Sequence, residues 1–461
     1  LNTGSNVVNP PQVAATSTES TGIGHTFTFD NSLTIAKGTV KTLALNCNLS
    51  SSSDNSSVYQ WGLGASPSIT VTGVTSSNSV LVSGVSSAQN GQAMTIGAGE
   101  LAATVDSGSP AYTIAAAGST GVTLGKYKLS STNETITVQR IGLALNADTA
   151  SSSATDLTQV SLWSNGSQIG TATFVGTNRN ATSTLTSTVI VPKDGSVVVE
   201  VRGDLATQGA SQASKPGALL EVNIDANGTN TQGVGSSGST INATADSTSV
   251  AGVRVFHSYP TVAQQTSGMS SSLVAQSGID LYKFSVSADS AGDVALNEFT
   301  VNVATSSVST TNGTTTVKVL RVYAYTDSAF SNVVSGSSYT AGQLNTSLPT
   351  VNSGDNVISF LAPLTVPAGF TYYFKVVGNI TQVAGTTGSA GTVTTKVVGD
   401  AAYPSLASGT LVSAFATSLG NFIWSPLSTT TSAAAVNADW TNGYQVPGIP
   451  SGGTNSFTLT K

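Results

Sequence analysis

Val189-Ile-Val-Pro-Lys-Asp-Gly-Ser-Val-Val-Val-Glu-Val-Arg-Gly-Asp-Leu205 is the stretch of this chain that decides its fold, because it occurs three times. Related copies occupy residues 33–49 and 364–380. Each copy joins two apolar segments through a short turn that contains a glycine, a pattern that predicts a β-hairpin. The turn glycines are Gly38, Gly195 and Gly369. A hairpin alone is marginally stable in water, so three copies predict three larger β modules in tandem.

The composition also favours an all-β chain. Charged residues make up 8% of the 461 residues, against about 25% in ordinary globular proteins. Thr and Val favour strands, whereas Gly, Asn and Ser favour turns, and long helical patterns are missing. Seven or so short strands per module, separated by turn clusters, predict immunoglobulin-like β-sandwiches.

Comparison of the three copies sets the predicted domain boundaries. The second and third copies follow similar strands, which run from Tyr127 to Trp163 and from Tyr282 to Tyr325, but no such strands precede the first copy. We therefore expect the first module to be incomplete. The predicted units are an N-terminal extended arm (1–24), an incomplete β-sandwich module (25–108), two β-sandwich modules (109–256 and 257–425), and a C-terminal tail with a terminal strand (426–461).

An incomplete sandwich exposes an apolar face and unpaired strand edges, both of which are unfavourable in water. An upstream part of the precursor, a neighbouring module or a second copy of the chain would have to cover them. If a neighbouring subunit adds the strands, the chain polymerises head to tail. The candidate donors are the arm (1–24) and the terminal strand, and the candidate interface residues at these places are His25, Phe27 and Phe29, which follow the arm, and Phe457 and Leu459.

The tail contains further candidate interface residues, Trp440 and Tyr444. Together with Trp424 they either pack against module three or a neighbouring subunit, or stack on sugar rings. The segments Asn421-Phe-Ile-Trp-Ser-Pro426 and Ala438-Asp-Trp-Thr-Asn-Gly-Tyr-Gln-Val-Pro447 resemble the ends of Ser/Thr-rich predicted surface proteins of candidate-phylum bacteria (Patescibacteria). The resemblance covers roughly residues 120–461 and implies a surface-layer or surface-filament subunit.

Other functional classes receive little support from the sequence. Lys and Arg number only 16 and the net charge is −6, so no basic surface for nucleic acid is expected. His25 and His257 are the only histidines, and neither lies near a nucleophile motif, so we expect no enzymatic activity. A glycosidase would need paired carboxylates, which so sparse a set of acids disfavours. The single cysteine, Cys47, permits no disulfide within the chain.

No cofactor is expected, and calcium is the one metal that stays open. Asn223-Ile-Asp-Ala-Asn-Gly228 matches the first half of a calcium loop, but Val234 occupies the position where the last acidic ligand belongs. A strand that ends in an Asn-Gly turn explains this motif better. Calcium between modules would use loop acids such as Asp148, Asp156, Asp289 and Asp293, although their spacing does not select them.

We expect an extracellular protein of the cell surface. No apolar run of about 18 residues is present, and a chain that begins at Leu1 without a signal peptide is expected to be a processed form. The expected function is a self-assembling subunit of an extracellular filament or surface layer, whose partners are copies of itself. The alternative is a surface adhesin or carbohydrate-binding protein, whose partners would be cell-wall or host-surface glycans.

Overall fold

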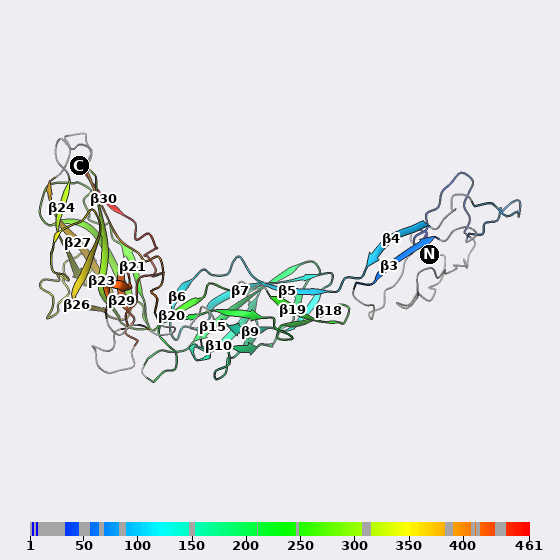
Figure 1. The fold of residues 1–461 in the computed structure, drawn as a ribbon, viewed down its shortest axis with the longest axis horizontal. Coiled ribbons are helices and arrows are strands. Elements are labelled where there is room, and N and C mark those ends of the chain that lie inside the picture. The colour runs from blue at the N-terminus through cyan, green and yellow to red at the C-terminus, as the bar shows by residue number, and fades with distance from the viewer. Residues whose placement is uncertain are drawn as a thin grey trace.

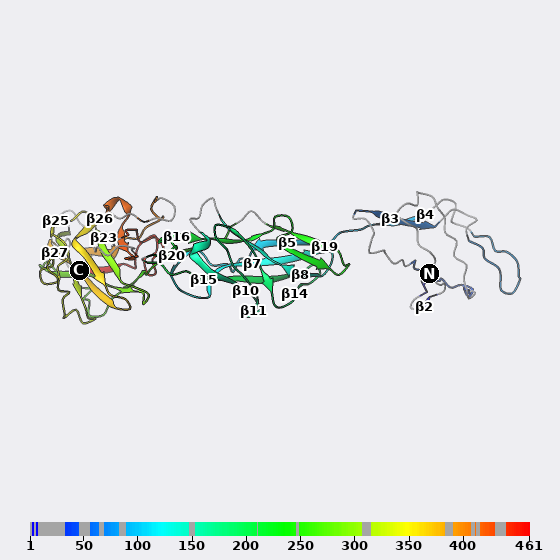
Figure 2. The same cartoon turned by 90° about the horizontal axis from the view of Figure 1, so that it is seen from below.

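The computed structural model describes residues 2–3, 6–7, 33–45, 56–63, 69–82, 89–146, 153–209, 211–245, 249–306, 315–382, 391–406, 411, 415–428 and 439–461. Within them the chain is built from β-strands, and its helical segments are two short 3-10 turns, η1 (Ala154–Asp156) and η3 (Thr417–Leu419). The predicted all-β chain of tandem sandwiches, with an incomplete first module, is confirmed. Figure 1 shows two sandwiches and a separate hairpin in line along the long axis, and Figure 2 shows them from below.

The middle sandwich is formed by strands between residues 100 and 256. One long sheet, in spatial order, contains β13 (Thr184–Leu185), β11 (Ser167–Ala172), β10 (Leu157–Ser164), β15 (Ser196–Leu205), β7 (Val122–Thr132), β5 (Glu100–Val105), β19 (Thr240–Ala245), β18 (Gln232–Gly235), β8 (Ile136–Arg140) and β14 (Val189–Val191). Two smaller sheets contain β12 (Asn180–Thr182), β9 (Gly142–Leu145) and β17 (Val222–Asp225), and β16 (Ala218–Leu220), β20 (Val253–Phe256) and β6 (Thr113–Ala116). The long sheet folds over at β5, which pairs antiparallel with β7 and parallel with β19, so that β14 packs against β15 and β7.

The pairing of β5 corrects the first domain boundary. Leu101 and Ala103 on this strand are buried in the core of the middle sandwich, at 1% and 2% exposure. The middle sandwich therefore begins before Glu100 and not after Gly108. The sequence could not locate this boundary, because the strands that pair with β5, β7 and β19, follow it at a distance along the chain.

The third sandwich has two five-stranded sheets. The first contains β21 (Pro260–Gln264), β22 (Ile279–Ala288), β27 (Thr371–Gln382), β24 (Thr316–Tyr325) and β25 (Leu348–Thr350). The second contains β26 (Gly354–Val366), β23 (Val294–Ser306), β28 (Thr392–Val397) and β30 (Phe457–Thr460), with β29 (Phe422–Ser425) also paired to β23. Because β30 is a strand of this sheet and Trp440, Val446 and Ile449 are buried against it or in the core, the described residues 426–428 and 439–461 belong to the third sandwich and are not a separate tail.

The repeated stretch is not a hairpin, which corrects the sequence-based prediction. In the second copy, β14 pairs with β8, whereas β15 pairs with β7 and β10. In the third copy, β26 pairs with β23, whereas β27 pairs with β22 and β24. Both edges of β15 and of β27 are thus occupied, so the strand before each turn has to join the opposite layer. The repeat is an arch that crosses from one layer of the sandwich to the other.

All three copies share the same turn geometry. A backbone carbonyl accepts a hydrogen bond from the amide of the residue three positions later. The residue just before that amide has the left-handed backbone conformation, with a positive φ. The bonds run from Thr39 to Ala36 (3.1 Å), from Gly195 to Pro192 (3.0 Å) and from Phe370 to Pro367 (3.0 Å). The left-handed residues are Gly38 (φ 76°), Asp194 (φ 53°) and Gly369 (φ 72°). The second copy therefore places an aspartate where the other two have glycine.

Asp194→Ala is expected to destabilise the middle sandwich by about 2 kcal/mol. The left-handed conformation costs alanine about 1 kcal/mol. The substitution also removes the bond that the Asp194 carboxylate accepts from the Asn133 amide at 3.0 Å, which is worth about 1 kcal/mol. Asp194→Gly loses the same bond without the strain, so urea denaturation should show a smaller loss. Equal losses for the two variants would refute the strain argument.

Candidate functional site

The segment between residues 33 and 99 differs from both sandwiches. Its paired strands among the described residues are β3 (Val58–Leu63) and β4 (Gln89–Thr95), which form one antiparallel hairpin. The remaining pairing there consists of single bridges, one joining Thr72 to Ser79 and one at Ala44. The first copy of the arch keeps its turn at Lys37-Gly38 but forms no β-ladder over the described residues 33–45.

Apolar side chains of this segment face solvent. Twelve of the 21 exposed large hydrophobic residues of the described chain lie here, although the two sandwiches contain most of the described residues. Val40, Val74 and Leu81 are 92%, 82% and 90% exposed. The others are Ile35, Leu43, Leu45, Val58, Leu63, Ile69, Val71, Val80 and Met94. We call these twelve residues the N-terminal apolar surface; so many exposed apolar side chains concentrated in one segment favour an interaction site there.

The two sandwiches show what the N-terminal segment lacks. The second strand of each complete arch lies between two strands that come earlier in the sequence. The strands that flank β15 are β7 and β10, and those that flank β27 are β22 and β24. The strands described before residue 33 are β1 (Asn2–Thr3) and β2 (Asn6–Val7), which pair only with each other. His25, Phe27 and Phe29 lie outside the described residues, as does Cys47.

The terminal strand is occupied within its own sandwich. β30 pairs with β28 over Thr392↔Thr460 to Thr395↔Phe457, and Leu459 is 1% exposed in the core. On its other side, the amide of Leu273 donates to the carbonyl of Thr460 at 3.0 Å. This corrects the expectation that Phe457 and Leu459 face another chain. The alternating pattern of the strand fits a donor and a sandwich edge equally well, so the sequence alone could not decide.

Trp440 is also internal. It is 3% exposed and packs on the outside of the β23–β29 sheet against Ala295 and Ile423, with the Phe415 ring 5.9 Å away. Trp424 is fully buried and its Nε1 donates to the carbonyl of Asn442 at 2.7 Å. Neither indole offers a face to a sugar, so of the alternatives left open by the sequence the structure shows packing against module three, and it corrects the expectation that Trp440 lies at an interface with another chain.

Tyr444 lies at an interface inside the chain, between the middle and third sandwiches. Its ring packs 5.0 Å from that of Tyr112, next to β6 of the middle sandwich. Arg254 on β20 places its guanidinium 3.5 Å from the ring centroid of Tyr403, and its Nε donates to the Tyr112 hydroxyl. Its Nη1 donates to the carbonyl of Gly217 at 2.5 Å. Burial raises the pKa of the Tyr112 hydroxyl, which therefore stays protonated at every physiological pH.

An aromatic contact reinforces this junction. Phe256, the last residue of β20, meets Trp424 edge to face at 4.9 Å between ring centroids. Phe256 and Ile114, both from the middle sandwich, belong to the apolar core of the third. The Nδ1 atom of His257 lies 3.1 Å from the carbonyl of Gln208, so this histidine is a junction residue. The two sandwiches are thus joined by side chains as well as by the chain itself.

Buried carboxylates hold the segment that carries Trp440 in place. Asp400 accepts hydrogen bonds from the amides of Asn421 (2.7 Å), Phe422 (3.2 Å) and Gly443 (2.8 Å). Glu298 on β23 is fully buried, and its Oε2 accepts a bond from the Ser359 hydroxyl at 2.6 Å. Its Oε1 has no hydrogen-bond partner among the described residues. Burial raises the pKa of Glu298, against the smaller opposite effect of the Ser359 bond.

Glu298→Gln is expected to stabilise the protein at pH 7 by on the order of 1 kcal/mol, because it removes a buried charge whose carboxylate is only half satisfied. The folded pKa exceeds the unfolded value of about 4.3. The contribution of Glu298 to stability is therefore complete below pH 4 and lost as the pH rises through its folded pKa. The advantage of the variant should vanish in acid when unfolding is followed by urea. Glu100→Gln is the control, because Glu100 is exposed to solvent and its substitution should change stability little. A stability advantage of Glu298→Gln that did not vary with pH would contradict this account.

The expected calcium ligands are used for other purposes. Asp225 at the end of β17 accepts bonds from Asn180, Asn230 and the amide of Asn227, which is the strand and turn favoured by the sequence. Asp156 is fully buried and accepts from Ser153, Ser214 and Lys215. The Asp293 carboxylate accepts a bond from the amide of Ala368 in the third arch, and the Asp289 carboxylate accepts one from the amide of Ala291, while the backbone carbonyl of Asp289 accepts from Gly369. Asp148 lies outside the described residues, and no metal-binding cluster occurs among the described ones.

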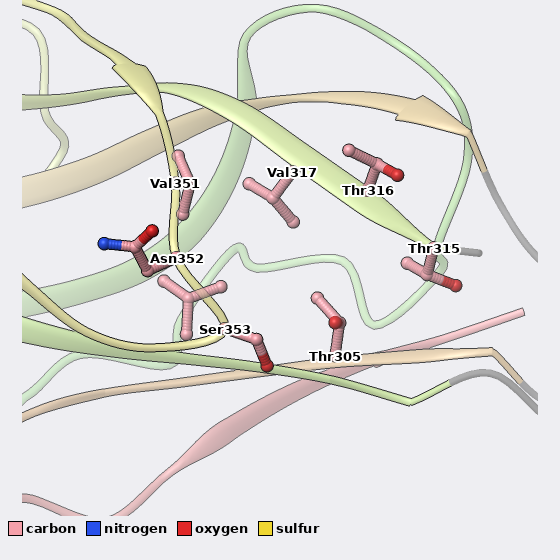
Figure 3. A pocket seen from close by; sticks show the side chains of 8 residues that line it. Thr305, Thr315, Thr316, Val317, Val351, Asn352 and Ser353 are labelled. Atoms are coloured by element: carbon pink, nitrogen blue, oxygen red, sulfur yellow. The ribbon is translucent and has the colours of Figure 1, made fainter.

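The third sandwich has a small pocket at one end of its two layers (Figure 3). Its lining residues are Val303, Thr305, Thr315, Thr316, Val317, Val351, Asn352 and Ser353. None of these carries a carboxylate, imidazole, amine or thiol that could act as a general acid or base.

Comparison with known proteins gives no family assignment. No protein-family model and no curated protein matches this chain. Among solved structures, the chain is similar to a complex of chaperone and tip adhesion subunit from archaic chaperone-usher Csu pili of Acinetobacter baumannii, at 12% identity and a TM-score of 0.20, covering 65% of this chain and 99% of that one. It is also similar to the collagen adhesin from S. aureus, at 14% identity and a TM-score of 0.13, covering 65% of this chain and 85% of that one. A third similar structure is a serine-rich repeat adhesion glycoprotein from Streptococcus agalactiae, at 9% identity and a TM-score of 0.14, covering 65% of this chain and 91% of that one. The strand pairing described above, and not these likenesses, carries the assignment of fold.

The described residues also include no helix of the length and apolar character needed to cross a bilayer.

Proposed function

We propose that this chain is a non-catalytic, extracellular structural protein that assembles with copies of itself through its N-terminal segment. The N-terminal apolar surface is the observation that carries the proposal. Both complete arches are flanked by strands on each side, whereas the described part of the first arch is not. Strands from a second copy would bury the exposed side chains and extend the short β-pairing of this segment.

The charge distribution suits contact between identical chains. Lys37, Lys41 and Asp54 are the only charged residues between positions 33 and 99. Identical segments therefore repel one another weakly, and few charges would have to be desolvated on contact. Because β30 belongs to the third sandwich, the candidate donor that remains is the arm, residues 1–24, which is followed by His25, Phe27 and Phe29. The rod of two joined sandwiches would then project from each assembly contact (Figure 1).

The test compares the full chain with a double variant in which two exposed side chains of the N-terminal apolar surface become polar, Val40→Ser with Leu81→Ser. Sedimentation velocity and electron microscopy of the purified native chain should show polymers, and the double variant should remain monomeric. Val175→Ser with Phe370→Ser is the matched control, because these residues are 67% and 64% exposed on the two sandwiches. Dispersed monomers of the native chain, or equal loss of polymers in the control, would overturn the proposal.

A further inference from the structure

The outer face of the first sheet of the third sandwich carries an ordered set of aromatic and basic side chains. Tyr323, Lys375 and Lys283 are direct cross-strand neighbours on β24, β27 and β22. Tyr325, Tyr373 and Ser285 form the next row. Residues that alternate with these, such as Ala324, Phe374 and Phe284, point into the core. The period of two in a strand therefore places both rows on the side away from the core.

Phe330 lies over these two rows. Its ring centroid is 5.4 Å from that of Tyr325 and 6.0 Å from that of Tyr373, in both cases edge to face. The ammonium groups of Lys283 and Lys375 lie 5.0 Å and 5.4 Å from the same ring. We call Lys283, Tyr323, Tyr325, Phe330, Tyr373 and Lys375 the aromatic–lysine face. Phe330, Tyr323, Tyr325, Tyr373 and Lys375 are partly exposed, so this face is open to a ligand.

The backbone of Phe330 is held in an unfavourable conformation. Its φ is 57°, a value that a bulky residue adopts at a cost of about 1–3 kcal/mol. Asp327 fixes this loop, since its carboxylate accepts hydrogen bonds from the amides of Ala329, Ser331 and Asn332. These bonds hold the pKa of Asp327 below its usual value. The Asp327 carboxylate thus holds the loop in the conformation that places the Phe330 ring above two lysines.

The charge on this face is unbalanced. Asp280 is the carboxylate that pairs with both lysines, at 3.0 Å from Lys283 and 3.4 Å from Lys375. Arg321, two residues before Tyr323 on β24, donates from Nε to the Ser347 hydroxyl at 2.7 Å. The face therefore has three cations, Lys283, Lys375 and Arg321, against two carboxylates, Asp280 and Asp327, and Asp327 is bound to backbone amides. A positive excess is notable in a chain whose net charge is −6.

We propose that the aromatic–lysine face binds an anionic polysaccharide built from uronic acids. Tyrosine and phenylalanine rings offer apolar surface to the faces of sugar rings, and their hydroxyls bond to sugar hydroxyls. Lys375 forms a charge-assisted hydrogen bond to a sugar carboxylate. The rows of aromatic and basic side chains run across three strands, which suits an extended polymer, and the face lies on a different module from the N-terminal apolar surface.

The experiment is calorimetric titration of the full chain with a hexamer of galacturonic acid and, separately, with its methyl ester. The acid should bind, and the uncharged ester should bind at least about tenfold more weakly, because one charge-assisted bond is worth about that factor. Lys375→Ala should weaken binding of the acid to a similar extent, and Tyr373→Ala should weaken binding of both. Lys128→Ala, which removes an exposed lysine from β7, should change neither. None of these variants should change the assembly seen by sedimentation.

Three results would overturn the proposal. They are no binding of the hexamer, equal affinity for acid and ester, or equal weakening by Lys375→Ala and Lys128→Ala. Binding to phosphatidylglycerol vesicles that is lost in Lys375→Ala while the hexamer fails to bind would assign the face to an anionic lipid surface instead. Circular dichroism of each variant checks that the sandwiches have folded.

Discussion

Trp424→Ala is expected to lower the free energy of unfolding by about 3–5 kcal/mol, the usual cost of removing a fully buried aromatic side chain. The loss combines a cavity beside Phe256 with an unpaired carbonyl at Asn442, which now accepts the indole N–H at 2.7 Å. Because the ring touches residues of both sandwiches, both should become less stable in urea.

Trp163→Ala is the matched control. This indole lies on β10, partly exposed, with the Arg202 guanidinium 4.3 Å from its ring. Its removal should cost about 1 kcal/mol, the range of exposed cation–π contacts. If Trp424→Ala were no more damaging than Trp163→Ala, the junction would not be a packed core.

Arg254→Ala is expected to separate the unfolding of the two sandwiches. The substitution leaves the buried Tyr112 hydroxyl without its Arg254 partner and removes the stacking on Tyr403, at a cost of about 3 kcal/mol. The native chain should show one calorimetric transition for residues 100–461, and the variant should show two.

Arg254→Lys tests which property of the side chain matters. Lysine keeps the charge but has neither the planar stacking surface nor the fork that reaches Tyr112 and Gly217 together. We therefore expect it to behave like the alanine variant, with a smaller loss. A single transition in Arg254→Ala would show that the chain connection alone couples the sandwiches.

The fold class and the repeats were predictable from the sequence because they depend on local patterns. Alternating apolar residues and turn residues predicted strands, and the repeated stretch predicted the modules. Pairing was not predictable in the same way. Whether Val189–Val191 pairs with Ser196–Leu205 depends on whether another strand already occupies the edge of the latter, and β7 and β10 do so from distant positions in the sequence.

The predicted interface residues were only partly informative. Trp440 and Leu459 were selected because they are large and apolar, but the same property suits burial within one chain, which is where they lie. The sequence analysis did not identify the junction residue Arg254 or the buried Glu298. Each is a single charged residue within an apolar stretch, Ser249–Phe256 and Val294–Val303, and this isolation could have marked both. The aromatic–lysine face depends on cross-strand register, which the sequence does not specify.

Hydrogen exchange of residues 33–99, measured over a wide range of protein concentration, tests most directly whether this segment is completed by a second copy. Backbone amides in β3, β4 and the first arch should exchange quickly in dilute protein and become protected as the concentration rises, while the cores of both sandwiches stay protected throughout. Protection of residues 33–99 that is already high in the dilute monomer and does not change with concentration would mean that the segment folds by itself, and would contradict the account.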